Sequence, residues 1–186
     1  MSNFLINAYR FIVAATYSAI IWTNKTEYSA TDASGALNKT DATANNSWSQ
    51  MCKSTSSAKP QADLSMKAIS TASHHVTYGL SWYDGTGPNG SAALDQQSVS
   101  YGIYSSSANA GRVYVNAIAR SASTGSTGDE WEIIMSSTDV VFKLDGEEIY
   151  TANAASGEAP DTSKDYYGVC SCYNTSTGLV SASLKT

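Results

Sequence analysis

Hydrophobic and polar residues alternate along much of this chain. Trp131, Ile133 and Met135 fall on one side of an extended strand. Glu130 and Glu132 fall on the other side, as in a strand that buries one face. Few windows carry apolar residues at the three- and four-residue spacing of an amphipathic helix. The pattern therefore predicts an all-β chain.

The clearest local signal is a hairpin. Residues 140–144 and 147–150 are two strand-like runs separated by Asp145-Gly146, the dipeptide that favours a two-residue turn. Further strands are predicted at residues 78–82, 99–104, 112–118, 166–170 and 178–182. Shorter strands are predicted in the first half, at residues 20–22, 36–37 and 64–69. Antiparallel pairing of these strands is expected because short Gly- and Ser-rich segments connect them.

The chain is predicted to form one domain. Its 186 residues suit a single core, and no Pro-rich or Gly/Ser-only linker divides them. We expect a β-sandwich over residues 20–186, preceded by residues 1–19 as an N-terminal arm or first strand.

Composition and charge exclude several partners. Charged residues make up only 15% of the chain and the net charge is -5, which argues against binding to a nucleic-acid backbone. The longest apolar run, residues 11–15, is far shorter than the roughly 20 residues of a membrane helix. Because only Arg10 precedes that run closely, we do not expect a cleaved signal peptide. A surface rich in Ser, Thr, Asn, Ala and Gly is typical of secreted β proteins and of virus-particle proteins.

The cysteines and histidines do not predict a metal site or a cofactor. Cys52, Cys170 and Cys172 are an odd set, and we expect them to be small buried hydrophobes. A Cys-x-Cys metal pair would need further ligands. His74 and His75 are adjacent, so a strand would direct them to opposite faces.

Four segments together resemble the concanavalin A-like lectin/glucanase jelly-roll superfamily, as carried by phage virion proteins. These segments are residues 98–104, 111–115, 127–133 and 140–150. The resemblance spans about residues 20–185 and is firm after about residue 78. It implies an all-β, antiparallel two-sheet jelly-roll sandwich. Residues 6–11 are similar to the start of some phage virion proteins.

One turn departs from that resemblance. The relatives carry Asn-Gly after the strand that matches residues 111–115, whereas this chain has Asn116-Ala117. We therefore expect a longer or differently shaped turn there.

No catalytic residues are expected. Glucanases of this superfamily place two carboxylates along one strand, and Glu130 and Glu132 are the nearest candidates. Their segment matches a different strand of the superfamily, and alternation makes them the solvent side of a half-buried strand. No Gly-x-Ser-x-Gly elbow accompanies the Ser residues. A glycoside hydrolase is the distant alternative.

A candidate glycan site follows the strand at residues 78–82. Trp82 or Tyr83 would stack on a pyranose ring, while Asp84 and Asn89 would hydrogen-bond its hydroxyls. The alternative is that Trp82 ends a core strand and that the Gly-rich segment after it only spans a loop.

These observations leave two leading hypotheses. The first is a non-enzymatic phage-type structural protein located in the virion, a capsid decoration or tail component. It would assemble as a homo-oligomer with other virion proteins and adhere to cell-surface carbohydrate. The second is a free lectin-like carbohydrate-binding module, secreted or at the cell surface.

Overall fold

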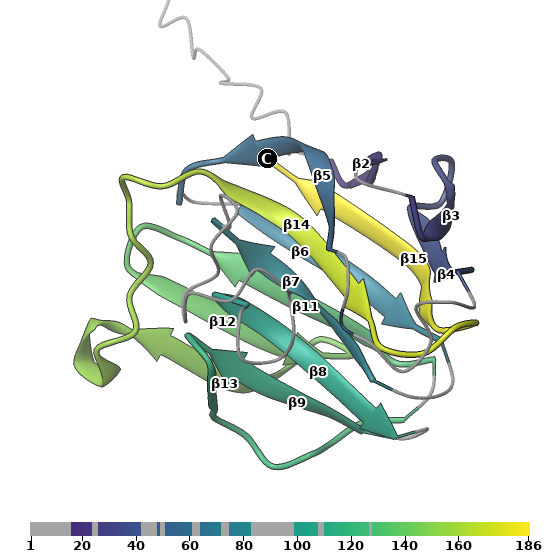
Figure 1. Ribbon diagram of the computed structural model, residues 1–186. Coiled ribbons are helices and arrows are strands. Elements are labelled where there is room, and N and C mark those ends of the chain that lie inside the picture. Colours follow the sequence, from purple (N-terminus) through teal and green to yellow (C-terminus); the bar gives the residue numbers. More distant parts are fainter. Residues whose placement is uncertain are drawn as a thin grey trace, which may run out of the picture.

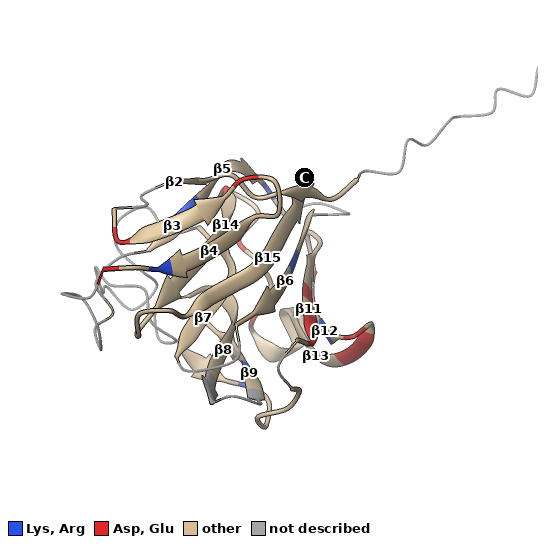
Figure 2. Ribbon diagram, turned by 90° about the vertical axis from the view of Figure 1, so that its right-hand side faces the viewer, with Lys and Arg blue, Asp and Glu red and all other residues tan. Residues whose placement is uncertain are grey.

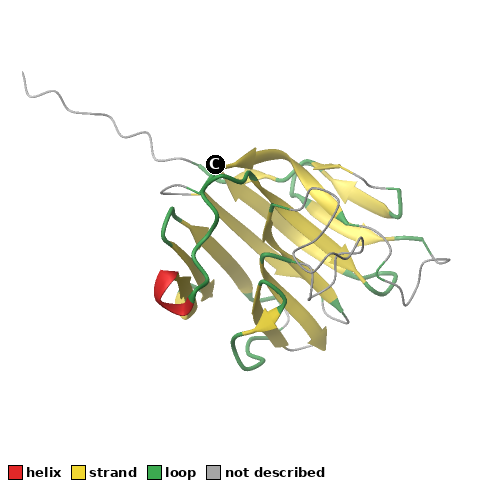
Figure 3. Ribbon diagram, turned by 60° about the vertical axis from the view of Figure 1, so that its left-hand side comes forward, coloured by secondary structure: helices red, strands yellow, loops and turns green. Residues whose placement is uncertain are grey.

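The chain folds into two antiparallel β-sheets packed face to face (Figure 1, Figure 3). The structure is a computed structural model that describes residues 16–23, 26–41, 48, 51–60, 64–71, 75–82, 99–107, 110–126 and 128–186. The predicted all-β, two-sheet architecture is confirmed. Within the described residues no helix has the length and apolar character needed to span a bilayer.

The first sheet has eight strands. In spatial order its main path is β13 (Glu147–Asn153), β12 (Asp139–Leu144), β11 (Glu130–Met135), β6 (Leu64–Ser70), β15 (Gly178–Lys185), β4 (Ala36–Lys39) and β3 (Tyr28–Thr31). The short β1 (Ser18–Ala19) pairs with β15. Because β6 lies between β11 and β15, segments far apart in the sequence are neighbours, as a jelly roll requires.

The second sheet has seven strands. Its order is β10 (Ile118–Ala119), β9 (Ala110–Val115), β8 (Tyr101–Ser107), β7 (Val76–Ser81), β14 (Tyr166–Cys172), β5 (Cys52–Ala58) and β2 (Trp22–Thr23). A short 3-10 helix, η2 (Ala154–Ser156), follows β13.

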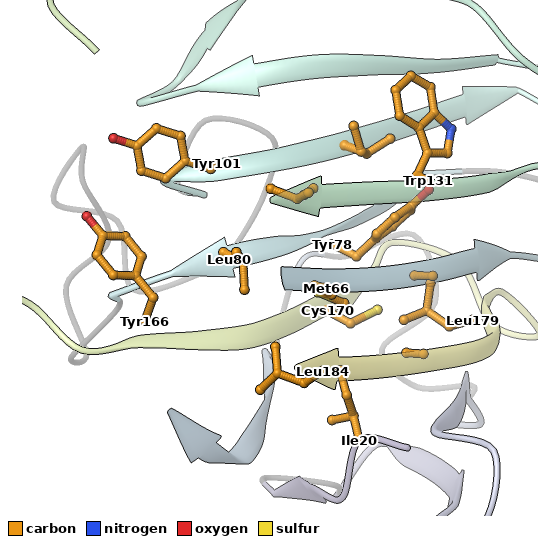
Figure 4. Close-up of a cluster of buried hydrophobic side chains, with 14 of the residues drawn as sticks. Ile20, Met66, Tyr78, Leu80, Tyr101, Trp131, Tyr166, Cys170, Leu179 and Leu184 are labelled. Atoms are coloured by element: carbon orange, nitrogen blue, oxygen red, sulfur yellow. The ribbon is translucent and has the colours of Figure 1, made fainter. Parts of the chain in front are cut away.

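Alternating side chains from both sheets form the core. Figure 4 shows Tyr78 of one sheet near Met66 and Trp131 of the other, and Tyr101 beside Tyr166, all almost completely buried. All three cysteines are buried free thiols, which confirms the prediction that they pack as small hydrophobes. Burial raises the pKa of the Cys170 thiol well above its usual value.

The N-terminal strand is divided where one strand was predicted. Residues 18–19 pair in the eight-stranded sheet and residues 22–23 in the seven-stranded sheet, so the chain crosses between layers at Ile20 and Ile21. The Ile20 side chain is buried in the core, and its N–H donates to the Ala182 carbonyl at 3.0 Å. A predicted continuous strand over 20–22 is therefore wrong.

Two hairpin turns have the same form. Asp145 and Gly146 have φ of 49° and 87°, which confirms the predicted two-residue turn. Asn116 and Ala117 have φ of 46° and 74° and join residues 115 and 118, which pair directly. The expectation of a longer or differently shaped turn there is wrong, since Asn accepts the left-handed region readily and Ala117 is held in it. The predicted strand over 112–118 is broken by this turn.

Candidate functional site: an aromatic face on the seven-stranded sheet

Side-chain alternation decides which residues of β8 and β9 face outward. Ile103 and Val113 are fully buried in the core, so Tyr104 and Arg112 lie on the outer face of the seven-stranded sheet. The register places Tyr104 directly opposite Arg112 on one side and Thr77 of β7 on the other. A row of outward side chains therefore crosses the sheet.

Aromatic rings gather along this row. The ring centroid of Trp48 lies 6.3 Å from that of Tyr104 and 5.5 Å from that of Tyr173. Tyr104 also meets the edge of Tyr114 at 5.9 Å, and His75 meets Tyr173 at 5.3 Å. All five side chains are half-buried, so they combine fixed positions with solvent access. We call this set, Trp48, His75, Tyr104, Tyr114 and Tyr173, the aromatic face.

His75 contacts both Tyr104 and Tyr173. It directly precedes β7 and has a left-handed φ of 44°. Its Nδ1 lies 2.5 Å from the Tyr104 hydroxyl, and its carbonyl accepts from the Tyr173 N–H at 2.9 Å. The ends of β7 and β14 thus set the orientation of both tyrosines.

A buried ammonium supports the backbone beneath Tyr173. Lys39 ends β4, and its Nζ donates to the carbonyls of Cys172 at 3.1 Å and Tyr173 at 3.4 Å. The Glu27 carboxylate lies 3.9 Å from the same nitrogen. Burial lowers the pKa of Lys39, and the charge of Glu27 opposes that shift. Lys39 therefore positions Tyr173 from inside the fold.

Apolar side chains cover the middle of the outer face of the seven-stranded sheet. Gly79 and Gly102 lie opposite each other there, and a Cβ on Gly102 would come within 2.7 Å of the Val99 side chain. Met51, Val99 and Val169 form a small apolar cluster against Tyr114 and Tyr167. The aromatic face therefore lies beside this apolar cluster, and Tyr114 contacts both.

Charge is divided unequally between the two sheets. The strands of the seven-stranded sheet contain Lys53 and Arg112 but no Asp or Glu. The acidic strand residues, including Glu130, Glu132 and Glu148, belong to the eight-stranded sheet, where Figure 2 shows red along β11 to β13. The aromatic face thus lies on the cationic sheet of a chain whose net charge is negative.

The predicted glycan loop is only partly described. Trp82 is half-buried, packs against the core, and carries the Lys164 ammonium 4.7 Å from its ring centroid. Tyr83, Asp84 and Asn89 lie outside the described residues. Trp82 and His75 flank opposite ends of β7, roughly 20 Å apart at the usual rise of a strand. The aromatic face is thus a different place, and glycan contact at the Trp82 loop stays a prediction.

Glu130 and Glu132, the two candidate catalytic carboxylates, form polar contacts on the outer face of the eight-stranded sheet. Glu130 pairs with Lys67 at 2.9 Å, and this hydrogen bond raises the pKa of Lys67. Glu132 accepts from the Tyr17 hydroxyl and from Ser65 at 3.3 Å. Their strand alternates half-buried and buried residues, which confirms that they form its solvent side. In the part of the chain that is described, no group of three or more His, Cys, Asp and Glu is placed to hold a metal.

A pocket of about 400 Å³ lies away from both places. It is lined mainly by the β1–β2 crossover and by β5, including Ile20, Ile21 and Ser54. Its lining consists of small hydroxyl and aliphatic side chains, without an aromatic ring or a charged side chain. It offers little to orient a polar ligand.

Sequence reasoning missed the aromatic face because its rings come from separate segments. A partial signal was present: Tyr104 and Tyr114 occupy outward positions in strands whose inward residues are Ile103 and Val113. Trp48 and Tyr173 carry no such signal, since neither lies in a strand.

Comparisons with known proteins show the fold alone. Scans against protein-family models and curated proteins found no match. Among solved structures, the Ca2+/Man2-bound exoplasmic/lumenal domain of VIP36 is similar with a TM-score of 0.58 at 10% identity, covering 88% of this chain and 80% of that one. The metal-free carbohydrate recognition domain of Emp46p gives 0.55 at 7% identity, covering 88% and 87%. The SPRY domain of human HERC1 gives 0.54 at 11% identity, covering 91% and 97%. The fold is therefore the concanavalin A-like jelly roll that the sequence resemblance implied.

Proposed function

We propose that this protein is a non-catalytic carbohydrate-binding module and that its aromatic face is the binding surface. The observation that carries the proposal is the group of five half-exposed rings on the outer face of the seven-stranded sheet. Flat rings bind the C–H faces of pyranoses, and a few fixed polar groups orient the hydroxyls.

The polar groups of the face suit that task. The Tyr104 hydroxyl and the His75 ring are held against each other, so both polar groups have fixed positions on the face. Little conformational entropy is lost on binding when the rings are already packed against one another. Two structural neighbours, the Man2-bound VIP36 domain and the Emp46p carbohydrate recognition domain, offer a precedent for sugar binding on this fold.

The absence of catalysis is part of the proposal. A glycoside hydrolase uses one carboxyl group as acid and another as nucleophile or base. Glu130 and Glu132 are the carboxylates that the sequence suggested, and they form polar contacts with Lys67, Tyr17 and Ser65. The strands beneath the aromatic face contain no carboxylate. This supports binding without turnover.

A glycan array followed by calorimetry tests the proposal. The full chain should bind at least one class of oligosaccharide, and Tyr104→Ala should weaken that binding by about tenfold. Trp82→Ala is the matched comparison, because it removes the ring of the rival loop and should leave the affinity unchanged. Retained affinity in Tyr104→Ala together with loss in Trp82→Ala would move the site to the loop.

The biological setting remains a prediction. The sequence resemblance favours a virion protein that assembles as a homo-oligomer, and a secreted or cell-surface module is the alternative. Light scattering on the full chain and on a version lacking residues 2–15 tests assembly through the arm. The deletion stops there because β1 starts at Ser18 and the Tyr17 hydroxyl bonds to Glu132. A full-length oligomer that becomes a folded monomer would support the structural role.

A further inference from the structure

The charge of the aromatic face suggests which glycans it would select. Arg112 stands next to Tyr104 in the outward row, and Lys53 lies on the same face with its ammonium 4.4 Å from the ring centroid of Tyr167. The seven strands of this sheet contain no Asp or Glu to neutralise either cation.

Arg112 has an unused donor at this place. Its Nε is shielded from solvent and has no hydrogen-bond partner among the described residues. A buried donor that belongs to a charged group is costly to leave unpaired, and because this nitrogen is shielded, an external anion would bind the outer N–H groups of the half-buried side chain. The guanidinium presents several N–H groups in a planar fork that suits carboxylate and sulfate oxygens.

The next residues in the row are polar and uncharged. Thr77 lies opposite Tyr104 and is fully buried, and its hydroxyl has no partner among the described residues. Its other neighbour across the sheet is Ser171 of β14, which is also buried. Because both of these residues are fully buried, an anion beside Arg112 would meet the aromatic rings of the face, with no repelling carboxylate from the strands.

We propose that the ligand is an acidic glycan, and that Arg112 binds its anionic group while the aromatic face stacks on the sugar ring. This inference rests on the proposed carbohydrate-binding function and narrows it to one ligand class. Carboxylated and sulfated sugars share the required chemistry, so both belong to the test. Arg112 would be the specificity-determining residue of the face.

The test compares charged and uncharged forms of the same sugar. The full chain is screened on an array of neutral, carboxylated and sulfated oligosaccharides, and the best acidic binder is then titrated beside its methyl ester or its desulfated form. The charged form should bind at least about tenfold more tightly, and added salt should reduce the difference.

Two variants assign the effect to Arg112. Arg112→Gln should abolish the preference for the charged form while leaving the affinity for the uncharged form within about twofold. Lys143→Gln removes one positive charge from β12 of the other sheet and should change neither value. Thermal unfolding of both variants checks that they are folded.

The outcomes separate this inference from the proposed function. Equal binding of charged and uncharged sugars would overturn acidic selectivity and leave carbohydrate binding intact. Equal losses in Arg112→Gln and Lys143→Gln would overturn the role of Arg112, because they would indicate a general charge effect. No binding to any sugar would overturn the proposed function, and this inference with it.

Discussion

At the scale of single residues, backbone conformation is costly at Ala117. This residue takes the second position of a two-residue turn with φ of 74°, a region that glycine enters without steric penalty. We expect Ala117→Gly to raise the free energy of unfolding by about 0.5 to 1 kcal/mol, measured by urea denaturation. Ala119→Gly is the control, because Ala119 lies in β10 and has no positive φ to relieve. An equal loss in both variants would contradict the argument.

A second residue-scale prediction concerns Thr77. Its fully buried hydroxyl has no partner among the described residues, and leaving such a group unpaired costs free energy. Thr77→Val keeps the shape and removes the hydroxyl, so the free energy of unfolding should rise by about 1 kcal/mol. Thr23→Val should lower the free energy of unfolding, because the Thr23 hydroxyl donates to the Lys53 carbonyl at 2.9 Å and that hydrogen bond would be lost. Destabilisation by Thr77→Val would mean that the hydroxyl is bound in the folded protein.

At the scale of elements, a buried carboxylate joins the edges of the two sheets. Glu158, which is 4% exposed, contacts the Arg120 guanidinium after β10 and accepts from the Tyr150 hydroxyl of β13 at 2.7 Å. Its carbonyl also accepts from the Tyr101 hydroxyl of β8 at 2.9 Å. One residue in the loop after β13 thus connects β13, β8 and the segment that follows β10.

Glu158→Gln tests the importance of this connection. The amide cannot replace the charge that faces Arg120, so the free energy of unfolding should fall by about 2 kcal/mol, with the partial exposure of Arg120 limiting the loss. In the background of Arg120→Gln the same substitution should cost much less, which a double-mutant cycle by chemical denaturation would measure. Additive losses would show that the two groups do not interact.

The strands differ in how well the sequence alone predicts them. Strands β11 to β13 were predictable because their inward residues alternate strictly and Asp145-Gly146 fixes the turn. The crossover at Ile20 was not, because two-residue strands are too short to show a period. The aromatic face needed the register of β7, β8 and β14 and the position of Trp48, which no local pattern contains.

At the scale of the whole molecule, the sandwich buries several tyrosine phenols between its layers. Tyr78, Tyr101 and Tyr166 are each at most 2% exposed, and burial is the largest cause that raises the pKa of each. For Tyr166 the pKa rises from 10.0 to about 12. The folded protein therefore keeps protons that the unfolded chain releases above pH 10.

The sign of this linkage predicts alkaline unfolding. Because the folded pKa values are raised, the unfolded state binds fewer protons than the folded state above pH 10, and stability must fall as pH rises from there. Urea denaturation should show a nearly constant free energy of unfolding up to about pH 9 and a steep decline between pH 10 and about 12. The ultraviolet signal of tyrosinate should appear together with the loss of sheet structure. Tyr166→Phe should flatten the decline at the cost of the 3.0 Å bond that the Asp161 N–H donates to the Tyr166 hydroxyl. Tyrosinate formation in a protein that stays folded would show instead that the layers admit water.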